Sequence, residues 1–208
     1  MSEMMSRIRN LHYLKSFGYE FVSKELNFTS KESDFAHLRA SVSRCELCSL
    51  SKKRHHSLIE PHLKPAKLMI LDTFADKSED ESGSLLLSNK GEKLLNLLKT
   101  ALNLSQDEIF LSYVYKCFSG GKNDASALSS CLPYFWSEFC LVKPRVLLIL
   151  GEDSFENLGF DDFKKLRGEL FTHLKAWVMP TFSVEFIIKN PSFELEFLND
   201  LSKIKGLL

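Results

Sequence analysis

The chain has 208 residues, of which 44% are hydrophobic, and its 27 basic and 27 acidic side chains leave no net charge. That length is enough for one sizeable hydrophobic core and a small appendage. The balanced charge argues against a protein that grips a long phosphate backbone, so any contact with nucleic acid has to be local.

Neither a membrane segment nor a signal peptide is expected. The sequence has no run of about 18 apolar residues, and its polar start lacks the apolar centre of a signal peptide. Five cysteines without secretion signals indicate a reducing compartment, where paired cysteines more often serve metal or redox chemistry than disulfides. We therefore expect a cytoplasmic protein, and we expect it to be a monomer.

The N-terminal part of the chain predicts a helical extension. Apolar residues recur at helical spacing over residues 7–28, which indicates an amphipathic helix. A second helix, capped by Ser33 or Asp34, is expected to lead up to the first cysteine pair. We predict an N-terminal helical extension over residues 1–32 and one larger domain over residues 33–208.

The larger domain alternates between strand patterns and helix patterns. This order predicts an α/β fold in which a central, mainly parallel four-stranded sheet is covered by helices on both faces, a three-layer αβα sandwich. The predicted strands span residues 67–71, 109–115, 145–150 and 177–179, and the predicted helices span residues 89–103, 124–141, 153–158 and 193–204.

A ligand site is expected at one edge of this sheet. In open α/β folds ligands bind beyond the carboxyl ends of the strands. Four segments follow the predicted strands and should border one cleft: residues 72–76, 113–117, 151–153 and 180–183.

Four cysteines predict one metal centre: Cys45, Cys48, Cys117 and Cys131. The first two form a Cys-x-x-Cys pair, a spacing that suits zinc, an iron–sulfur cluster or a redox dithiol. A redox dithiol normally follows a strand and opens a helix, whereas this pair ends a predicted helix. Spacing alone leaves zinc and iron–sulfur open. A lone cysteine is often only a core residue, and we expect that role for Cys140.

The order of these motifs resembles the family 4 uracil-DNA glycosylases over residues 37–205. The matching pieces are Cys45-Glu46-Leu47-Cys48-Ser49-Leu50, the basic Arg54, Lys116-Cys117, Cys131 with Pro133, Pro144 through Leu150-Gly151, Arg167-Gly168 and Pro180-Thr181. Each piece alone is a weak signal, and it is their order and spacing that carry the resemblance.

The resemblance implies a uracil-DNA glycosylase-like fold and DNA, single-stranded or damaged, as a partner. It also implies a 4Fe–4S cluster on Cys45, Cys48, Cys117 and Cys131, which excludes Cys140. The basic residues that it suggests for contact with nucleic acid are Arg54, Lys116, Arg167 and Lys189.

The base-binding motifs of that family are replaced in this chain. The Gly-Glu-(Ala or Gly)-Pro-Gly loop falls on Asp72-Thr73-Phe74-Ala75-Asp76, although the following Glu-Asp-x-x-Gly is kept from Glu79 to Gly83. The phenylalanine that would stack on uracil falls on Leu86, and the asparagine that would read its edge falls on Tyr113. The His-Pro pair that would stabilise the leaving base falls on Ser183-Val184.

Three functions remain open from the sequence. The first is a glycosylase-like iron–sulfur protein of DNA repair that has lost ordinary uracil excision and binds nucleic acid or a protein partner. The second is an active glycosylase of altered base specificity, in which Asp72, Thr73 or Asp76 supplies a new acid or hydroxyl and Tyr113 stacks or donates. The third is a structural zinc protein without a nucleic-acid role.

Overall fold

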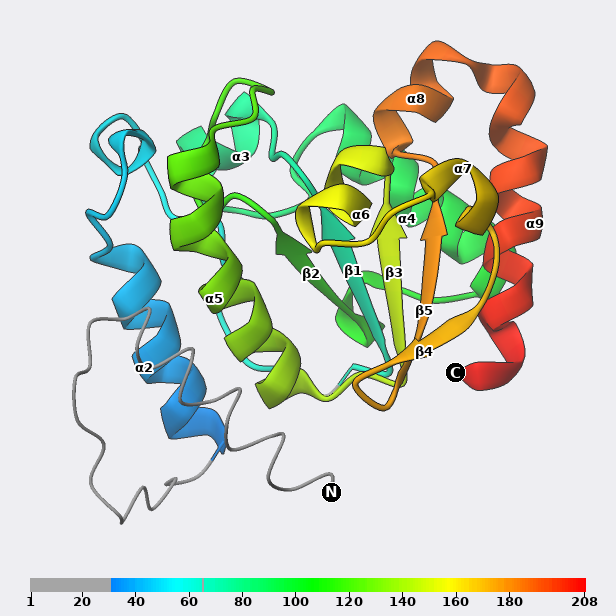
Figure 1. Cartoon of the computed structure of the whole chain (residues 1–208), viewed down its shortest axis with the longest axis horizontal. Coiled ribbons are helices and arrows are strands. Elements are labelled where there is room, and N and C mark those ends of the chain that lie inside the picture. The colour runs from blue at the N-terminus through cyan, green and yellow to red at the C-terminus, as the bar shows by residue number, and fades with distance from the viewer. Residues whose placement is uncertain (1–30, 65) are drawn as a thin grey trace.

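A sheet between two helical layers forms the body of the protein. The computed structural model describes residues 31–64 and 66–208, and in this part of the chain the strands take the order β2-β1-β3-β5-β4 (Figure 1). The helix predicted over residues 7–28 lies outside the described residues. The strands are β1 (Leu68–Asp72), β2 (Ile109–Tyr113), β3 (Val146–Leu150), β4 (Phe171–His173) and β5 (Ala176–Thr181).

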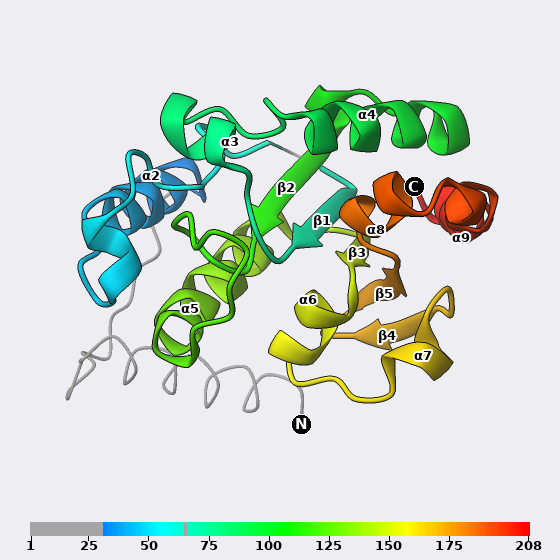
Figure 2. The ribbon, with the colours of Figure 1, turned by 90° about the horizontal axis from the view of Figure 1, so that it is seen from above.

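Helices cover both faces of the sheet, which confirms the predicted α/β sandwich. Figure 2 shows α4, α8 and α9 on one face and α5 and α6 on the other, and α2 packs against α5. The helices are α2 (Lys31–Ser43), α3 (Lys77–Ser82), α4 (Asn89–Leu102), α5 (Ala125–Val142), α6 (Glu152–Asn157), α7 (Phe163–Leu166), α8 (Val184–Lys189) and α9 (Glu194–Ile204). Four short 3-10 turns, η1 (Ser49–Lys52), η2 (Gln106–Glu108), η3 (Pro191–Phe193) and η4 (Lys205–Leu207), complete the described elements.

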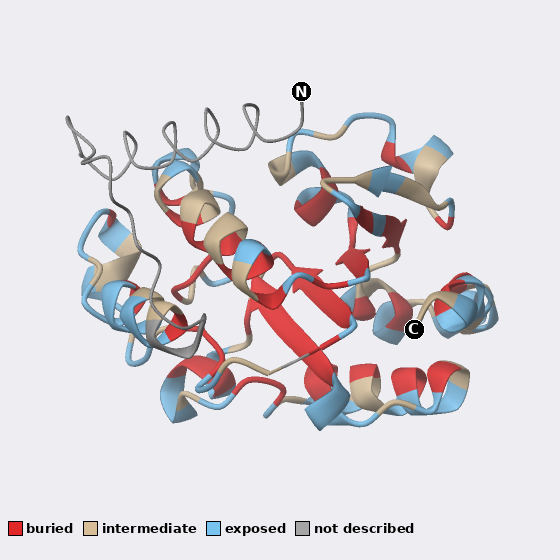
Figure 3. Cartoon of the chain, turned by 90° about the horizontal axis from the view of Figure 1, so that it is seen from below, coloured by how far each residue is buried: buried red, intermediate tan, exposed pale blue. Residues whose placement is uncertain are grey.

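The central strands are buried on both faces, as Figure 3 shows. Every residue of β1, β2 and β3 is buried, and separate apolar clusters fill the space on the two sides of the sheet. Strands covered on both faces read as continuous apolar runs, which is why they were predictable. β1 pairs in parallel with β2 and β3, and β3 with β5, so their carboxyl ends meet at one edge.

The sheet has one strand more than the four predicted. β4 pairs antiparallel with β5 through a two-residue turn at Leu174-Lys175, where both residues have positive φ, 50° and 70°. Such turns usually contain glycine or asparagine, and a Leu-Lys pair gives no such signal. The short helices α3, α7 and α8 were also not predicted, because segments of four to six residues show too little periodicity.

The predicted domain boundary after residue 32 falls inside α2. Among the described residues, no helix is long and apolar enough to cross a membrane.

Gly91 allows the start of α4 to pack against the preceding loop. A Cβ at this position would lie 2.4 Å from the carbonyl oxygen of Leu86 and 2.5 Å from its Cα. Leu86 itself has a φ of 65°, a backbone conformation that is strained for a branched side chain. The loop backbone therefore has little freedom to move away.

We expect Gly91→Ala to lower the free energy of unfolding by about 1–3 kcal/mol, because the new methyl group overlaps backbone atoms. Gly206→Ala is the matched control, since a Cβ there meets nothing within 4 Å. Urea unfolding of the two variants checks this. Equal stability of both variants and the parent would contradict the steric argument.

Candidate functional site

The structure brings the four predicted cysteines to one region, although they come from distant parts of the sequence. Cys45 and Cys48 lie between α2 and η1, Cys117 follows β2, and Cys131 lies in α5. Cys48, Cys117 and Cys131 are buried and Cys45 is partly buried. None of the five cysteines forms a disulfide.

Arg54 ties the segments that carry the cysteines together. Its Nη1 donates to the Sγ of Cys117 at 3.2 Å and to the carbonyl of Val42 at 3.1 Å. Its Nη2 donates to the carbonyls of Ser43 at 2.6 Å and Cys45 at 3.1 Å. The guanidinium thus satisfies carbonyls at the end of α2 and points at the cysteine region, which gives no support to its predicted contact with nucleic acid.

The cysteine sulfurs are close enough to affect one another. Burial raises the pKa of Cys117, Arg54 opposes this shift, and the neighbouring Cys48 and Cys45 add to it. Burial also raises the pKa of Cys131 to about 12, even though the backbone N–H of Lys116 lies 3.5 Å from its Sγ. Without a metal these thiols keep their protons at neutral pH, so metal binding has to displace them.

A compact single-ion site is not formed. Within residues 31–64 and 66–208, no three His, Cys, Asp or Glu side chains converge closely enough to hold one metal ion. The nearest histidines serve another purpose, since the Nδ1 atoms of His55 and His56 bond to Asp80 at 2.8 and 2.9 Å. Asp80 belongs to the retained Glu-Asp-x-x-Gly motif, which therefore anchors the loop after the cysteine pair.

The prediction for Cys140 is wrong, because this residue is exposed. The buried stripe of α5 passes through Cys131, Phe135, Phe139 and Val142. Cys140 follows Phe139 by one residue, a rotation of about 100° on a helix, and this turns it away from the core.

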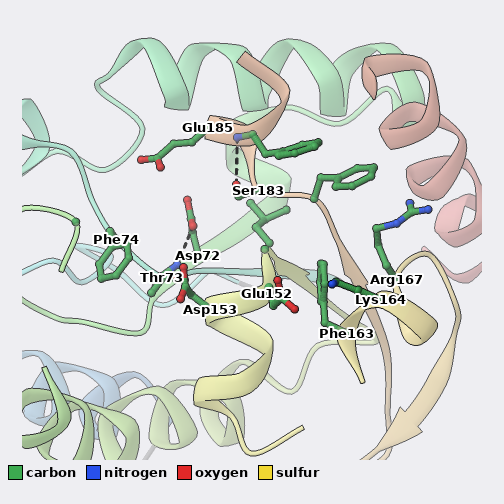
Figure 4. A pocket seen from close by; sticks show the side chains of 15 residues that line it. Asp72, Thr73, Phe74, Glu152, Asp153, Phe163, Lys164, Arg167, Ser183 and Glu185 are labelled. Atoms are coloured by element: carbon green, nitrogen blue, oxygen red, sulfur yellow. Dashed lines mark hydrogen bonds between the residues drawn. The ribbon is translucent and has the colours of Figure 1, made fainter. Parts of the chain in front are cut away.

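A cavity of about 550 Å³ opens at the carboxyl ends of β1, β3 and β5. Three of the four predicted border segments contribute to it (Figure 4). The fourth, residues 113–117, does not line the cavity. The lining residues are Asp72, Thr73, Phe74, Gly121, Leu150, Gly151, Glu152, Asp153, Phe163, Lys164, Arg167, Phe182, Ser183, Glu185 and Phe186.

The six pocket positions identified from the sequence are divided among three places. Asp72, Thr73 and Ser183 line the cavity. Asp76 and Leu86 instead border a separate surface depression beside α3. Tyr113 is only 1% exposed and lines neither.

Tyr113 is held by Glu79. Its hydroxyl donates to the two carboxylate oxygens of Glu79 at 2.9 and 3.0 Å, and burial, followed by the negative charge of Glu79, keeps the pKa of Tyr113 well above its usual value. Glu79 also accepts hydrogen bonds from the backbone N–H groups of Asp76 and Leu86. The polar groups of this position are therefore satisfied within the protein.

Lys90 lies between Tyr113 and the cavity wall. Its Nζ is 3.1 Å from Asp72 Oδ2, donates to the carbonyl of Phe74, and lies 5.5 Å from the centre of the Tyr113 ring. Burial alone would lower the pKa of Lys90, but the charge of Asp72 and its hydrogen bond outweigh it and raise the pKa. Lys90 is thus a buried cation paired with Asp72.

The hydroxyl groups of Thr73 and Ser183 both form hydrogen bonds within the protein. The hydroxyl of Thr73 bonds to that of Ser154 at 2.6 Å. The hydroxyl of Ser183 accepts from the backbone N–H of Phe186 at 3.2 Å and so caps α8. Ser183 Oγ can still donate one hydrogen bond toward the cavity.

The basic residues predicted to bind nucleic acid differ in accessibility. Lys116 is only 1% exposed, and its Nζ pairs with Glu138 at 2.6 Å and with Ser112 at 2.8 Å. This burial contradicts its predicted role. Arg167 is paired with Asp200 and Glu196. Lys189, at the end of α8, is exposed and remains a candidate contact.

Sequence reasoning missed several residues that shape this region. Lys90 and Glu138 were not singled out, because a charged residue in an amphipathic helix is usually solvated. Phe182 and Phe186 also gave no signal, yet their rings stack at 4.8 Å beside the cavity, and Arg167 lies 4.3 Å from the centre of the Phe182 ring.

Comparison with known proteins gives consistent matches. A family model described as the uracil DNA glycosylase superfamily matches residues 62–202. A type-4 uracil-DNA glycosylase of Sulfurisphaera tokodaii is 24% identical over 182 residues, which covers 82% of this chain and 83% of the relative. Similar relatives with the same description come from Saccharolobus solfataricus, 24% identical with 80% and 83% covered, and from Pyrobaculum aerophilum, 24% identical with 83% and 94% covered.

Proposed function

Because the chain belongs to the uracil DNA glycosylase superfamily, we propose that it is a 4Fe–4S protein of DNA repair that binds nucleic acid and has lost ordinary uracil excision. One observation in particular supports the proposed loss of uracil excision. The position of the base-reading asparagine holds Tyr113, whose hydroxyl is bound to Glu79 and whose ring lies beside the ammonium of Lys90. A flipped uracil would find this reading position occupied and its polar groups already paired.

The replaced motifs support the same conclusion. Cleavage of a glycosidic bond needs a donor that stabilises charge on the leaving base. Ser183 stands at that position and caps α8 instead. Leu86 stands at the stacking position, borders a different depression from Ser183, and has no aromatic face.

The cluster is proposed on Cys45, Cys48, Cys117 and Cys131. The all-sulfur donor set is the one that iron–sulfur clusters use. Arg54 donates to Cys117 Sγ, and the backbone N–H of Lys116 approaches Cys131 Sγ, as donors do around cluster sulfurs. When bound, the cluster would join the segment before β1 to α5, which makes its role structural.

We expect the double variant Cys45→Ala/Cys48→Ala to lose nearly all of its iron, because two of four ligands disappear. The matched control is Cys140→Ala, which should keep the iron content of the parent since Cys140 is exposed and outside the group. Iron per chain after anaerobic purification, with circular dichroism to confirm folding, checks this. A folded double variant with unchanged iron would contradict the assignment of the ligands.

The second candidate, an active glycosylase of altered base specificity, has one observation in its favour. The cavity of about 550 Å³ retains acidic and hydroxyl groups at the strand ends, with Asp72, Asp153 and Ser183 among its walls. Base release from a panel of damaged duplexes, abolished by Asp72→Asn, would favour this candidate over the first.

A further inference from the structure

The cavity has the size and the position of a small-molecule site. Its volume is about 550 Å³, within the range of about 300–1,000 Å³ that is typical of ligand pockets. β1 and β3 are neighbours in the sheet, so the residues that follow them meet at one side of the cavity. α7 packs on β5 and supplies the other side.

The charges in the cavity wall favour a cation. Arg167 is paired with Glu196 and Asp200, and Asp72 is paired with the buried Lys90, so these groups add little net potential. Among the other charges of the wall, Lys164 alone opposes Glu152, Asp153 and Glu185. Neither Glu152 nor Glu185 has an ion pair within the described part of the chain. The wall contains four carboxylates, Asp72, Glu152, Asp153 and Glu185, and two cations, Lys164 and Arg167.

Negatively and positively charged side chains lie on opposite sides of the cavity. Figure 4 shows Asp72, Asp153 and Glu185 on the side of Phe74, and Lys164 and Arg167 on the opposite side. Asp153 also accepts a hydrogen bond from Asn123 at 3.1 Å, which fixes its carboxylate. The side of the cavity that holds Phe74 is therefore both acidic and aromatic.

Phe74 is held as a rigid wall. Its ring stacks on Tyr115 with the centres 5.4 Å apart and the planes 9° from parallel, and Tyr115 is only 1% exposed. The Phe74 carbonyl is fixed by Lys90. An aromatic face attracts cations, most strongly where water is excluded.

The arrangement suits a flat organic cation better than a metal ion. In residues 31–64 and 66–208 the carboxylates do not converge in a group of three that could hold a metal. Dispersed carboxylates and an aromatic face match a charge that is spread over a ring. Under the proposed function Asp72, Thr73 and Ser183 stand at base-site positions, and all three line this cavity, which points to a nucleobase.

We propose that this cavity binds a nucleobase that carries a positive charge, as N-alkylated purines do. The inference rests on the proposed function, under which the site no longer takes neutral uracil. It adds the chemical class of the ligand, which the superfamily match does not supply. The base can come from a free nucleoside or from a nucleotide in DNA, and both sources share this chemistry.

The test uses two isomers of one compound. 1-Methyladenosine is protonated and cationic at pH 7, whereas its isomer N6-methyladenosine has the same heavy atoms and is neutral. We expect the cationic isomer to bind the full-length protein about tenfold more tightly by isothermal titration calorimetry, the effect of one cation–π contact supported by nearby carboxylates. Equal binding of the two isomers, or no binding of either, would overturn the proposal.

Variants locate the binding. Phe74→Leu keeps the apolar volume but removes the aromatic face, and should weaken 1-methyladenosine binding about 3- to 10-fold. Glu152→Gln should weaken it about threefold. Glu156→Gln is the control, one turn further along α6, exposed and outside the cavity, and should have no effect. Equal effects of the two glutamate variants on affinity would overturn the assignment of binding to this cavity.

Two further binding experiments identify the ligand more closely. Oligonucleotides that contain either methyladenine show whether DNA or the free nucleoside is the better source, and a cationic preference in either arm supports the proposal. Tetramethylammonium, a cation without a ring, should not compete, and equal competition would overturn the assignment to a nucleobase. Uracil release is assayed on the same preparation, so a failure of the proposed function is seen separately from a failure of base binding.

Discussion

Purified protein incubated with uracil-containing single-stranded or double-stranded DNA is expected to release no more uracil than buffer does. Removing one oxyanion-type donor from an enzyme costs about 100- to 1,000-fold in rate. By the resemblance described above, the positions of the donor, the edge reader and the stacking ring fall on Ser183, Tyr113 and Leu86. Such losses are not strictly additive, but together they should bring the rate below detection.

Under the proposed function, two further polar groups near the cavity are already engaged in contacts within the protein. The Tyr113 hydroxyl faces Glu79 rather than the cavity, and Lys90 is paired with Asp72. Reaching a base would require breaking these buried contacts, which costs free energy at each step.

The positive control for this assay is the type-4 uracil-DNA glycosylase of Saccharolobus solfataricus, measured at the same protein concentration. Uracil release comparable to the control would contradict the proposed loss of excision. If Asp72→Asn abolished that release, the protein would be an active glycosylase in which Asp72 supplies the new acid, although its base specificity would not be altered.

Lys116→Met is expected to destabilise the protein by about 3–5 kcal/mol, because it leaves the carboxylate of Glu138 buried without its counter-ion. The two side chains are 2% and 0% exposed, and their charged atoms are 2.6 Å apart. Glu138 Oε1 has no hydrogen-bond partner in the described residues, so removal of Lys116 leaves only Ser112 to support this group. Urea unfolding of the purified variant measures the loss.

Two controls separate burial from charge. Lys77→Met removes a lysine from an exposed pair with Glu81, whose side chains are 72% and 52% exposed, and should change stability by no more than about 0.5 kcal/mol. The double variant Lys116→Met/Glu138→Met should recover most of the lost stability, since an apolar pair can replace a buried ion pair. A Lys116→Met variant as stable as Lys77→Met would show that the buried pair contributes little.

The elements that were predicted correctly are those whose local pattern decides the structure. The strand at residues 145–150 is a continuous apolar run, and the helix after Asp124 begins where the Asp124 side chain accepts from the N–H of Ala127 at 2.9 Å. β4 escaped prediction because its three residues and its Leu174-Lys175 turn lack the usual hairpin composition.

The site was only partly predictable, because its chemistry depends on pairs of residues distant in sequence. Thr73 and Ser183 were identified at the strand ends and do line the cavity. Lys90 was not identified from the sequence, since its burial depends on its pairing with Asp72, 18 residues earlier. Lys116 follows β2 as the family motif requires, yet its partner Glu138 on α5 turns it inward, which no local pattern indicates.

The iron and acid-labile sulfide content of the protein after anaerobic purification tests the proposed cluster directly. A 4Fe–4S cluster on Cys45, Cys48, Cys117 and Cys131 predicts about four iron atoms and about four sulfides per chain, with the brown colour of such clusters. A colourless protein that contains one zinc ion per chain and no sulfide would contradict it.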